Sequence, residues 1–108
     1  LLSGPGNDLV SSTDLTAAGA HLILFTTGRG TPFGAPAPTV KISTNTALYE
    51  KKNGWIDFNA GSVAEGEPLD EAGDRLLDYV LEVAGGKRTK TEERGFREIS
   101  IFKDGVVL

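Results

Sequence analysis

Residues 21–34, HLILFTTGRGTPFG, join a short apolar run to a polar stretch rich in glycine. The apolar residues of HLILF are continuous rather than alternating, which is typical of a strand covered on both faces in a parallel sheet. A buried helix has the same pattern, but the short length of the run and the glycines that bound it favour the strand. Thr26 and Thr27 would then lie at the carboxyl end of the strand, where open α/β sheets bind ligands.

The loop that follows, GRGTPFGAPAP (28–38), holds three glycines and three prolines, a composition that blocks regular structure. It matches neither the Walker sequence nor the glycine fingerprint of dinucleotide-binding domains, so nucleotide binding is not supported. The backbone N–H groups of Gly28 and Gly30, with the guanidinium of Arg29 between them, instead suit a carboxylate. The alternative is a structural turn in which Arg29 pairs with a nearby acidic residue.

Two more strands are expected, one at TVKIS (39–43) and one within WIDFNAG (55–61). Between them, TNTALYEKKN (44–53) predicts a short helix with Thr44 or Asn45 as its cap. A parallel crossover usually takes a dozen or more residues and a helix. The proline-rich segment before residue 39 therefore predicts either an irregular connection or two strands that are not neighbours in the sheet.

Helices are expected on both sides of these strands. SSTDLTAAGA (11–20) predicts a short helix that is capped by one of its first three hydroxyl residues and stopped by Gly19. EPLDEAGDRLLDYVLEVAGG (67–86) has leucine and valine at helical spacing, acidic residues at its start and two glycines at its end. The tail (96–108) alternates and then turns at Asp104, which predicts a late strand or an extended arm.

Strands that alternate with helices indicate an α/β fold, here a single unit over residues 1–108. All three expected strands end in polar residues, and Asp57 and Asn59 share one face of the third strand. Either this pair serves a ligand or it caps a helix or turn. Lys41 lies inside an otherwise apolar strand, which marks it either as an edge residue or as a buried functional group.

Composition excludes several classes of protein. Eleven basic and fifteen acidic residues give a charge of −4, which argues against a nucleic-acid surface; the one basic cluster, KRTK (87–90), is expected to be a solvated loop. Cysteine is absent and His21 is the one histidine, more suited to packing than to catalysis, so a zinc site is not expected. No apolar run reaches the roughly 20 residues that cross a bilayer. A cytoplasmic protein is predicted, and the missing initial methionine suggests a fragment.

Several stretches together resemble the C-terminal region of the altronate/galactarate dehydratase family of sugar-acid dehydratases. They are AGAHLILFTTGRGTPFG (18–34), PTVKISTNT (38–46), WIDFNAG (55–61) and the tail GGKRTKTEERGFREISIF (85–102). The resemblance covers nearly the whole chain. It implies a bacterial hydro-lyase that removes water from an aldonate or aldarate, such as altronate or galactarate, to give a 2-keto-3-deoxy acid. It also implies a Rossmann-like, mostly parallel sheet with flanking helices, of which this chain is one part, and a homo-oligomer with further domains.

Dehydration of a sugar acid needs a base for the proton α to the carboxylate, stabilisation of the enediolate, and help for the departing hydroxide. Under the resemblance, Arg29 with the N–H groups of Gly28 and Gly30 suits the carboxylate and the enediolate. Lys41 would add positive charge, or serve as the base if burial lowers its pKa. Polar groups that suit the sugar hydroxyls lie at Thr26, Thr27, Asn45, Asp57 and Asn59.

The resemblance also implies a divalent metal, with ferrous iron as the first expectation. Hard oxygen donors are present, but softer ligands such as histidine would come mainly from outside this chain. A different class of function stays open beside the enzyme. The same glycine-rich loop suits a non-catalytic α/β module that binds an anionic metabolite or a partner chain.

Overall fold

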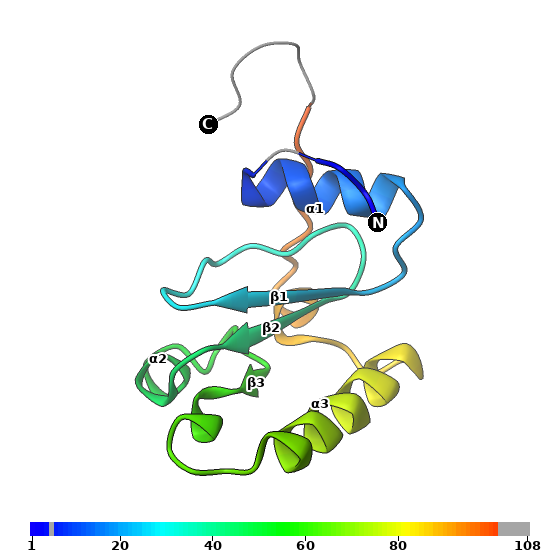
Figure 1. Ribbon diagram of the computed structural model, residues 1–108. Helices are drawn as coiled ribbons and strands as arrows, with labels where there is room; N and C mark the ends of the chain where they lie inside the picture. Colours follow the sequence, from blue (N-terminus) through cyan, green and yellow to red (C-terminus); the bar gives the residue numbers. More distant parts are fainter. Residues whose placement is uncertain (5, 102–108) are drawn as a thin grey trace.

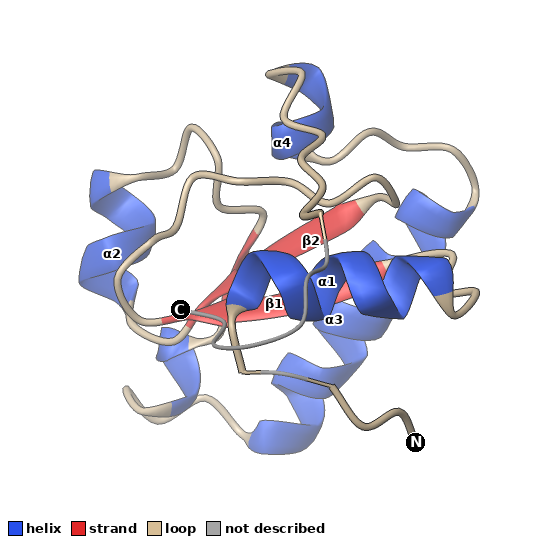
Figure 2. Cartoon of the chain, turned by 90° about the horizontal axis from the view of Figure 1, so that it is seen from above, coloured by secondary structure: helices blue, strands red, loops and turns tan. Residues whose placement is uncertain are grey.

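The computed structural model describes residues 1–4 and 6–101. The elements in chain order are α1 (Asp8–Ala17), β1 (Ile23–Thr27), β2 (Thr39–Ser43), α2 (Thr46–Lys51), β3 (Phe58–Asn59), the short 3-10 helix η1 (Gly61–Val63), α3 (Leu69–Ala84) and α4 (Lys90–Glu93). The three strands form one parallel sheet in the order β1-β2-β3. Helix α1 lies on one side of this sheet and α3 on the other (Figures 1 and 2). The predicted α/β class and parallel sheet are therefore confirmed.

Strand β2 is the centre of the sheet, and all five of its residues are buried. One of its faces packs with β3 and α3 in an apolar core built on Val40, Ile42, Phe58 and Val83. Helix α3 lies within the predicted range and ends at Ala84, directly before the glycine pair that indicated its stop. The prediction of a helix that docks through an apolar stripe holds, although Leu77 and Leu81 on α3 remain largely exposed.

Strand β1 differs from the prediction in position and in coverage. It begins two residues later than expected and includes both threonines. The expectation that both faces are covered is wrong, because the side chain of Leu24 is 49% exposed and Thr26 is exposed as well. The physical reason is that Leu24 and Thr26 share a face with Val40 and Ile42, and the apolar core on that face is built on β2, β3 and α3 and does not extend over the outer strand β1.

The connection between β1 and β2 is irregular, which was one of the two predicted alternatives. Both strands are neighbours, and residues 28–38 join them without a helix. The loop is fastened to the C-terminal segment, since the N–H of Glu98 donates to the carbonyl of Gly34 over 2.7 Å. A Cβ atom at Gly34 would lie 2.3 Å from the Phe96 carbonyl oxygen, so only glycine fits at this position.

The start of α1 and the basic cluster depart from the sequence predictions, whereas the start of α2 agrees with one of its two predicted alternatives. Helix α1 begins earlier than expected because the side chain of Asn7 accepts from the N–H groups of its first turn, one turn before the predicted hydroxyl caps. Asn45 is the cap of α2, which was one of the two alternatives. The basic cluster is not simply a solvated loop, because Thr89 within it is fully buried and closes a capping box on α4.

The tail lacks helix and strand up to Ile101, so the extended-arm alternative describes this part of it. The N–H of Ser100 donates to the Thr13 hydroxyl over 3.0 Å, which ties the arm to α1. The predicted turn at Asp104 lies outside the described residues. No helix within residues 1–4 and 6–101 combines the length and the apolar character that a bilayer crossing requires.

Candidate functional site

The carboxyl ends of the three strands meet at one edge of the sheet, as the sequence predicted. Thr27 pairs in register with Ser43, and Ser43 pairs with Asn59. The Thr27 carbonyl accepts from the N–H of Thr44 over 3.1 Å, so the ends of β1 and β2 are fastened together. The polar residues thus form a row along one rim.

The two rim asparagines bind other parts of the same chain. The Asn45 Oδ1 accepts from the N–H of Leu48, and its Nδ2 donates to the Gly28 carbonyl over 3.3 Å. The Asn59 amide donates to the Thr46 hydroxyl and accepts from the N–H of Gly61. Both amides therefore hold the rim together, and their role in substrate binding stays a prediction.

Asp57 lies just before β3, at the end of the strand that is opposite the rim. Its side chain is 8% exposed and its carboxylate accepts three hydrogen bonds, from the Lys41 N–H, the Tyr79 hydroxyl and the Lys90 N–H. Burial, with the nearby Asp57 carboxylate, raises the pKa of Tyr79. These contacts match the alternative of a capping residue, while a substrate role for Asp57 stays a prediction.

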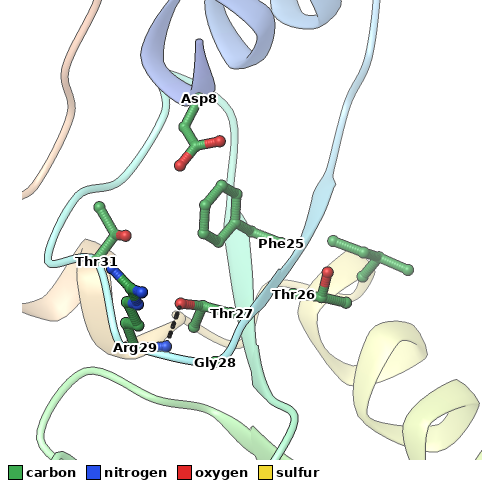
Figure 3. A pocket seen from close by; sticks show the side chains of 8 residues that line it. Asp8, Phe25, Thr26, Thr27, Gly28, Arg29 and Thr31 are labelled. Carbon is green, nitrogen blue, oxygen red and sulfur yellow. Dashed lines mark hydrogen bonds between the residues drawn. The ribbon is translucent and has the colours of Figure 1, made fainter. Parts of the chain in front are cut away.

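A pocket of about 470 Å³ lies beside the carboxyl end of β1 (Figure 3). Its lining residues are Asp8, Leu24, Phe25, Thr26, Thr27, Gly28, Arg29 and Thr31. Four of the predicted site residues are among them, from Thr26 to Arg29. Gly30, Lys41, Asn45, Asp57 and Asn59 are not in this lining.

The turn after β1 uses some of the backbone groups that the sequence assigned to a ligand. The Thr27 hydroxyl accepts from the N–H of Gly30 over 2.9 Å and from the N–H of Arg29 over 3.3 Å. Gly30 is buried with a φ of +83°, and a Cβ there would lie 2.9 Å from the Lys52 side chain. Gly30 therefore shapes the turn, and Gly28, which is exposed in the pocket lining, has the more accessible backbone.

Arg29 points its guanidinium along the pocket wall beside Thr31 (Figure 3). The residue is exposed, and neither of the two salt bridges in the described part of the chain includes it. The alternative of an arginine neutralised by a nearby acidic residue is thus not observed. An exposed guanidinium in a concave lining is available for a carboxylate.

Lys41 stands opposite Phe25 in the register of β1 and β2, and it is fully buried. The alternative of an edge residue is wrong because β2 is the central strand. The Lys41 Nζ lies 4.7 Å from the centroid of the Phe25 ring and 4.6 Å from that of Phe33, and it donates a hydrogen bond to the Thr31 carbonyl. Phe25 and Thr31 both line the pocket, so the amine lies directly behind the pocket wall.

The environment of Lys41 favours its neutral form. Burial lowers the pKa of its ammonium group from 10.5 to about 8. Three carboxylates act in the opposite direction, those of Asp57, Asp8 and Glu98. At pH 7 roughly a tenth of the molecules then carry a neutral amine, which is enough for a general base.

The described residues do not by themselves fit a divalent metal. Within residues 1–4 and 6–101, no three histidine, cysteine, aspartate or glutamate side chains are grouped as ligands. The pocket offers one carboxylate, that of Asp8, together with threonine hydroxyls. Because hard cations take about six oxygen ligands, no catalytic step through a metal follows from this donor set.

The sequence missed Asp8, Leu24, Phe25 and Thr31 as pocket residues. Phe25 and Thr31 directly flank the predicted site residues 26–30 in the sequence, and this position could have marked them as pocket residues. Asp8 lies in α1, and only the packing of that helix brings it to the pocket. No local pattern in the sequence marks it.

The fold and the site define an α/β unit that presents an arginine-bearing pocket at the carboxyl edge of a parallel sheet, backed by a buried lysine. The chain belongs to the D-galactarate/altronate dehydratase family: the family model of the C-terminal region matches residues 1–107. The family that the sequence resembled is thereby confirmed.

Named relatives agree with this membership. The altronate dehydratase of Bacillus subtilis (strain 168) is 55% identical over the whole chain, and that of Escherichia coli (strain K12) is 50% identical over the whole chain. The galactarate dehydratase (L-threo-forming) of Escherichia coli (strain K12) is 37% identical over 95% of the chain. The chain spans 22% of the length of each altronate dehydratase and 20% of the galactarate dehydratase.

Proposed function

We propose that this chain is part of a sugar-acid dehydratase that removes water from an aldonate or aldarate, such as altronate or galactarate, to give a 2-keto-3-deoxy acid. Family membership and the names of the relatives support this assignment. The observation that carries the contribution of this chain is a pocket whose lining includes Arg29, which takes part in neither salt bridge of the described residues, while the Lys41 amine is buried behind the pocket wall.

In the proposed reaction, Arg29 holds the substrate carboxylate. Removal of the α-proton turns this carboxylate into an enediolate with a second negative charge. A guanidinium binds that dianion more strongly than the singly charged substrate, so it lowers the barrier to proton removal. Loss of the β-hydroxide then gives an enol, which tautomerises to the 2-keto acid.

Lys41 is the proposed base. Because the amine lies behind the wall of Phe25 and Thr31, this role requires that the wall opens so that the neutral amine reaches the α-proton. The resulting ammonium then returns to the Thr31 carbonyl and to the faces of Phe25 and Phe33, which stabilise the charged form. The alternative is that Lys41 stays protonated and only adds positive charge. The two roles predict opposite pH dependences of kcat/KM. If Lys41 is the base, kcat/KM rises with pH up to about 8; if the protonated amine only adds charge, kcat/KM falls above about 8.

The proposal includes ferrous iron or another divalent metal, because the family resemblance implies one. Its ligands would come mainly from outside this chain. No step assigned to Arg29 or Lys41 depends on it. A complete enzyme would include further domains, and a homo-oligomer is proposed for it.

The outer side of β1 is the proposed contact with those further domains. Alternate residues of β1 bond to β2, so the backbone groups of Leu24 and Thr26 face the open edge of the described sheet. Leu24 is exposed beside this edge, and Leu77 and Leu81 of α3 are 55% and 60% exposed. An unpaired edge and exposed leucines suit an added strand with an apolar face.

The proposal is tested with the complete enzyme under anaerobic conditions with iron, over a panel of aldonates and aldarates. Arg29→Lys should lower kcat/KM on the best substrate about 100-fold, because an ammonium group cannot form the two parallel hydrogen bonds that a guanidinium forms with a carboxylate. Arg88→Lys is the matched control, since Arg88 is exposed and lies outside the pocket lining. Equal kinetics for the Arg29 variant and the control would contradict the proposed site. Binding of a sugar acid without any turnover would instead favour the non-catalytic module.

A further inference from the structure

The pocket carries opposite charges on two sides. Asp8, in the first turn of α1, extends its carboxylate from above toward the space beside the Phe25 ring, while Arg29 lies below it beside Thr31 (Figure 3). No salt bridge of the described residues joins Asp8 to Arg29, so their charged groups are more than 4.0 Å apart. A ligand in this pocket therefore meets a cation on one side and an anion on the other.

An ionised aspartate only accepts hydrogen bonds. It binds a hydroxyl group of a sugar well and repels a carboxylate. An aldonate has one carboxylate and a neutral terminal hydroxymethyl group, whereas an aldarate has a carboxylate at both ends. With the reacting carboxylate on Arg29, the far end of the substrate is the end that meets Asp8.

We propose that Asp8 is a specificity-determining residue that selects sugar acids with one carboxylate over those with two. The inference rests on the proposed function, because it takes Arg29 as the group that holds the reacting carboxylate. Asp8 acts on the reacting carboxylate of both substrates alike, so removing its charge changes their ratio through the far carboxylate, which only the dicarboxylate has. Across an open, solvated pocket such a repulsion amounts to about a tenfold difference in kcat/KM.

Asp8 also acts on the amine behind the wall. Its carboxylate is one of the three that favour the ammonium form of Lys41. An Asp8→Asn variant should therefore have a second measurable effect. Loss of the Asp8 charge lowers the pKa of Lys41, so kcat/KM should reach its plateau at a lower pH than in the wild type. A residue with a purely structural role in α1 would leave both the substrate preference and this pH unchanged.

The experiment compares altronate with altrarate, its dicarboxylate counterpart, on the complete enzyme. The wild type should prefer altronate, and Asp8→Asn should raise the altrarate/altronate ratio of kcat/KM about tenfold. Asp14→Asn is the matched control, because Asp14 lies in the same helix but not in the pocket lining. The control should leave the ratio as in the wild type.

An Asp8→Asn ratio within twofold of the wild type, or a wild type that prefers altrarate, would overturn the inference. Calorimetry separates this failure from that of the proposed function. If the wild type dehydrates no sugar acid, the proposed function fails, while the ratio of the two dissociation constants in the wild type and in Asp8→Asn still decides the role of Asp8. If neither acid binds, both proposals fail.

Discussion

Replacing Lys41 by methionine should make the chain more stable at neutral pH. The side chain is fully buried, and its pKa is about 8 instead of 10.5. This difference corresponds to a cost of about 3 kcal/mol for holding the charged form in the folded state. Methionine has a similar length and no charge, but it leaves the Thr31 carbonyl without the amine donor, which costs about 1 kcal/mol. The net gain in the free energy of unfolding at pH 7 is about 2 kcal/mol.

The pH dependence of this gain has a definite sign. Below pH 8 the lysine is protonated in both the folded and the unfolded chain, so the full cost is present. Between pH 8 and 10.5 the folded chain loses the proton while the unfolded chain keeps it, and the wild type becomes more stable as the pH rises. The advantage of Lys41→Met should therefore shrink above pH 8 and reverse to about −1 kcal/mol near pH 10.5.

Urea denaturation of the 108-residue wild type and variant from pH 6 to pH 10.5 measures this difference directly. Groups other than Lys41 contribute equally to both proteins and cancel. Lys51→Met is the control: Lys51 is exposed at the end of α2, so its substitution should change stability little and by the same amount throughout this range. A Lys41→Met variant that is less stable than wild type by a constant amount from pH 6 to pH 10.5 would refute the reasoning.

Four further substitutions test the packing and the exposed surface. Gly34→Ala should lower the free energy of unfolding by at least about 2 kcal/mol, because the new Cβ meets the Phe96 carbonyl. Gly73→Ala is in open space on α3 and should raise the free energy of unfolding by up to about 1 kcal/mol. Denaturant unfolding measures both changes. Asp57→Asn should lower the free energy of unfolding by about 2 to 3 kcal/mol in the same assay, because it removes a charge that receives three hydrogen bonds; a loss below about 0.5 kcal/mol would contradict a stabilising role for these bonds. Leu77→Lys should reduce self-association of the isolated chain in light scattering, and a wild-type chain that is already monomeric would argue against the exposed contact face.

Local sequence patterns were sufficient for most of the elements. The apolar spacing of residues 67–86 places α3, and the glycines at its end place its stop. Asn45 caps α2 because an asparagine side chain reaches only the N–H groups of the next turn, an interaction that adjacent residues encode by themselves. The rim is equally local, since each strand ends in its own polar residue and parallel strands share one edge.

Tertiary structure decided what those residues do. Lys41 could be an edge or a buried residue until the strand order placed β2 in the centre, and the same order left Leu24 exposed on β1. Asp57 follows a pattern that suits a ligand, yet its oxygens are taken up by donors that are 16 to 33 residues away. Asp8 enters the pocket only through the packing of α1. The sequence alone determined the three strands, the longer helices and the rim, because those depend on neighbours along the chain, although it missed η1 and α4. Burial, charge and partners depend on neighbours in space, and only the folded arrangement supplies them.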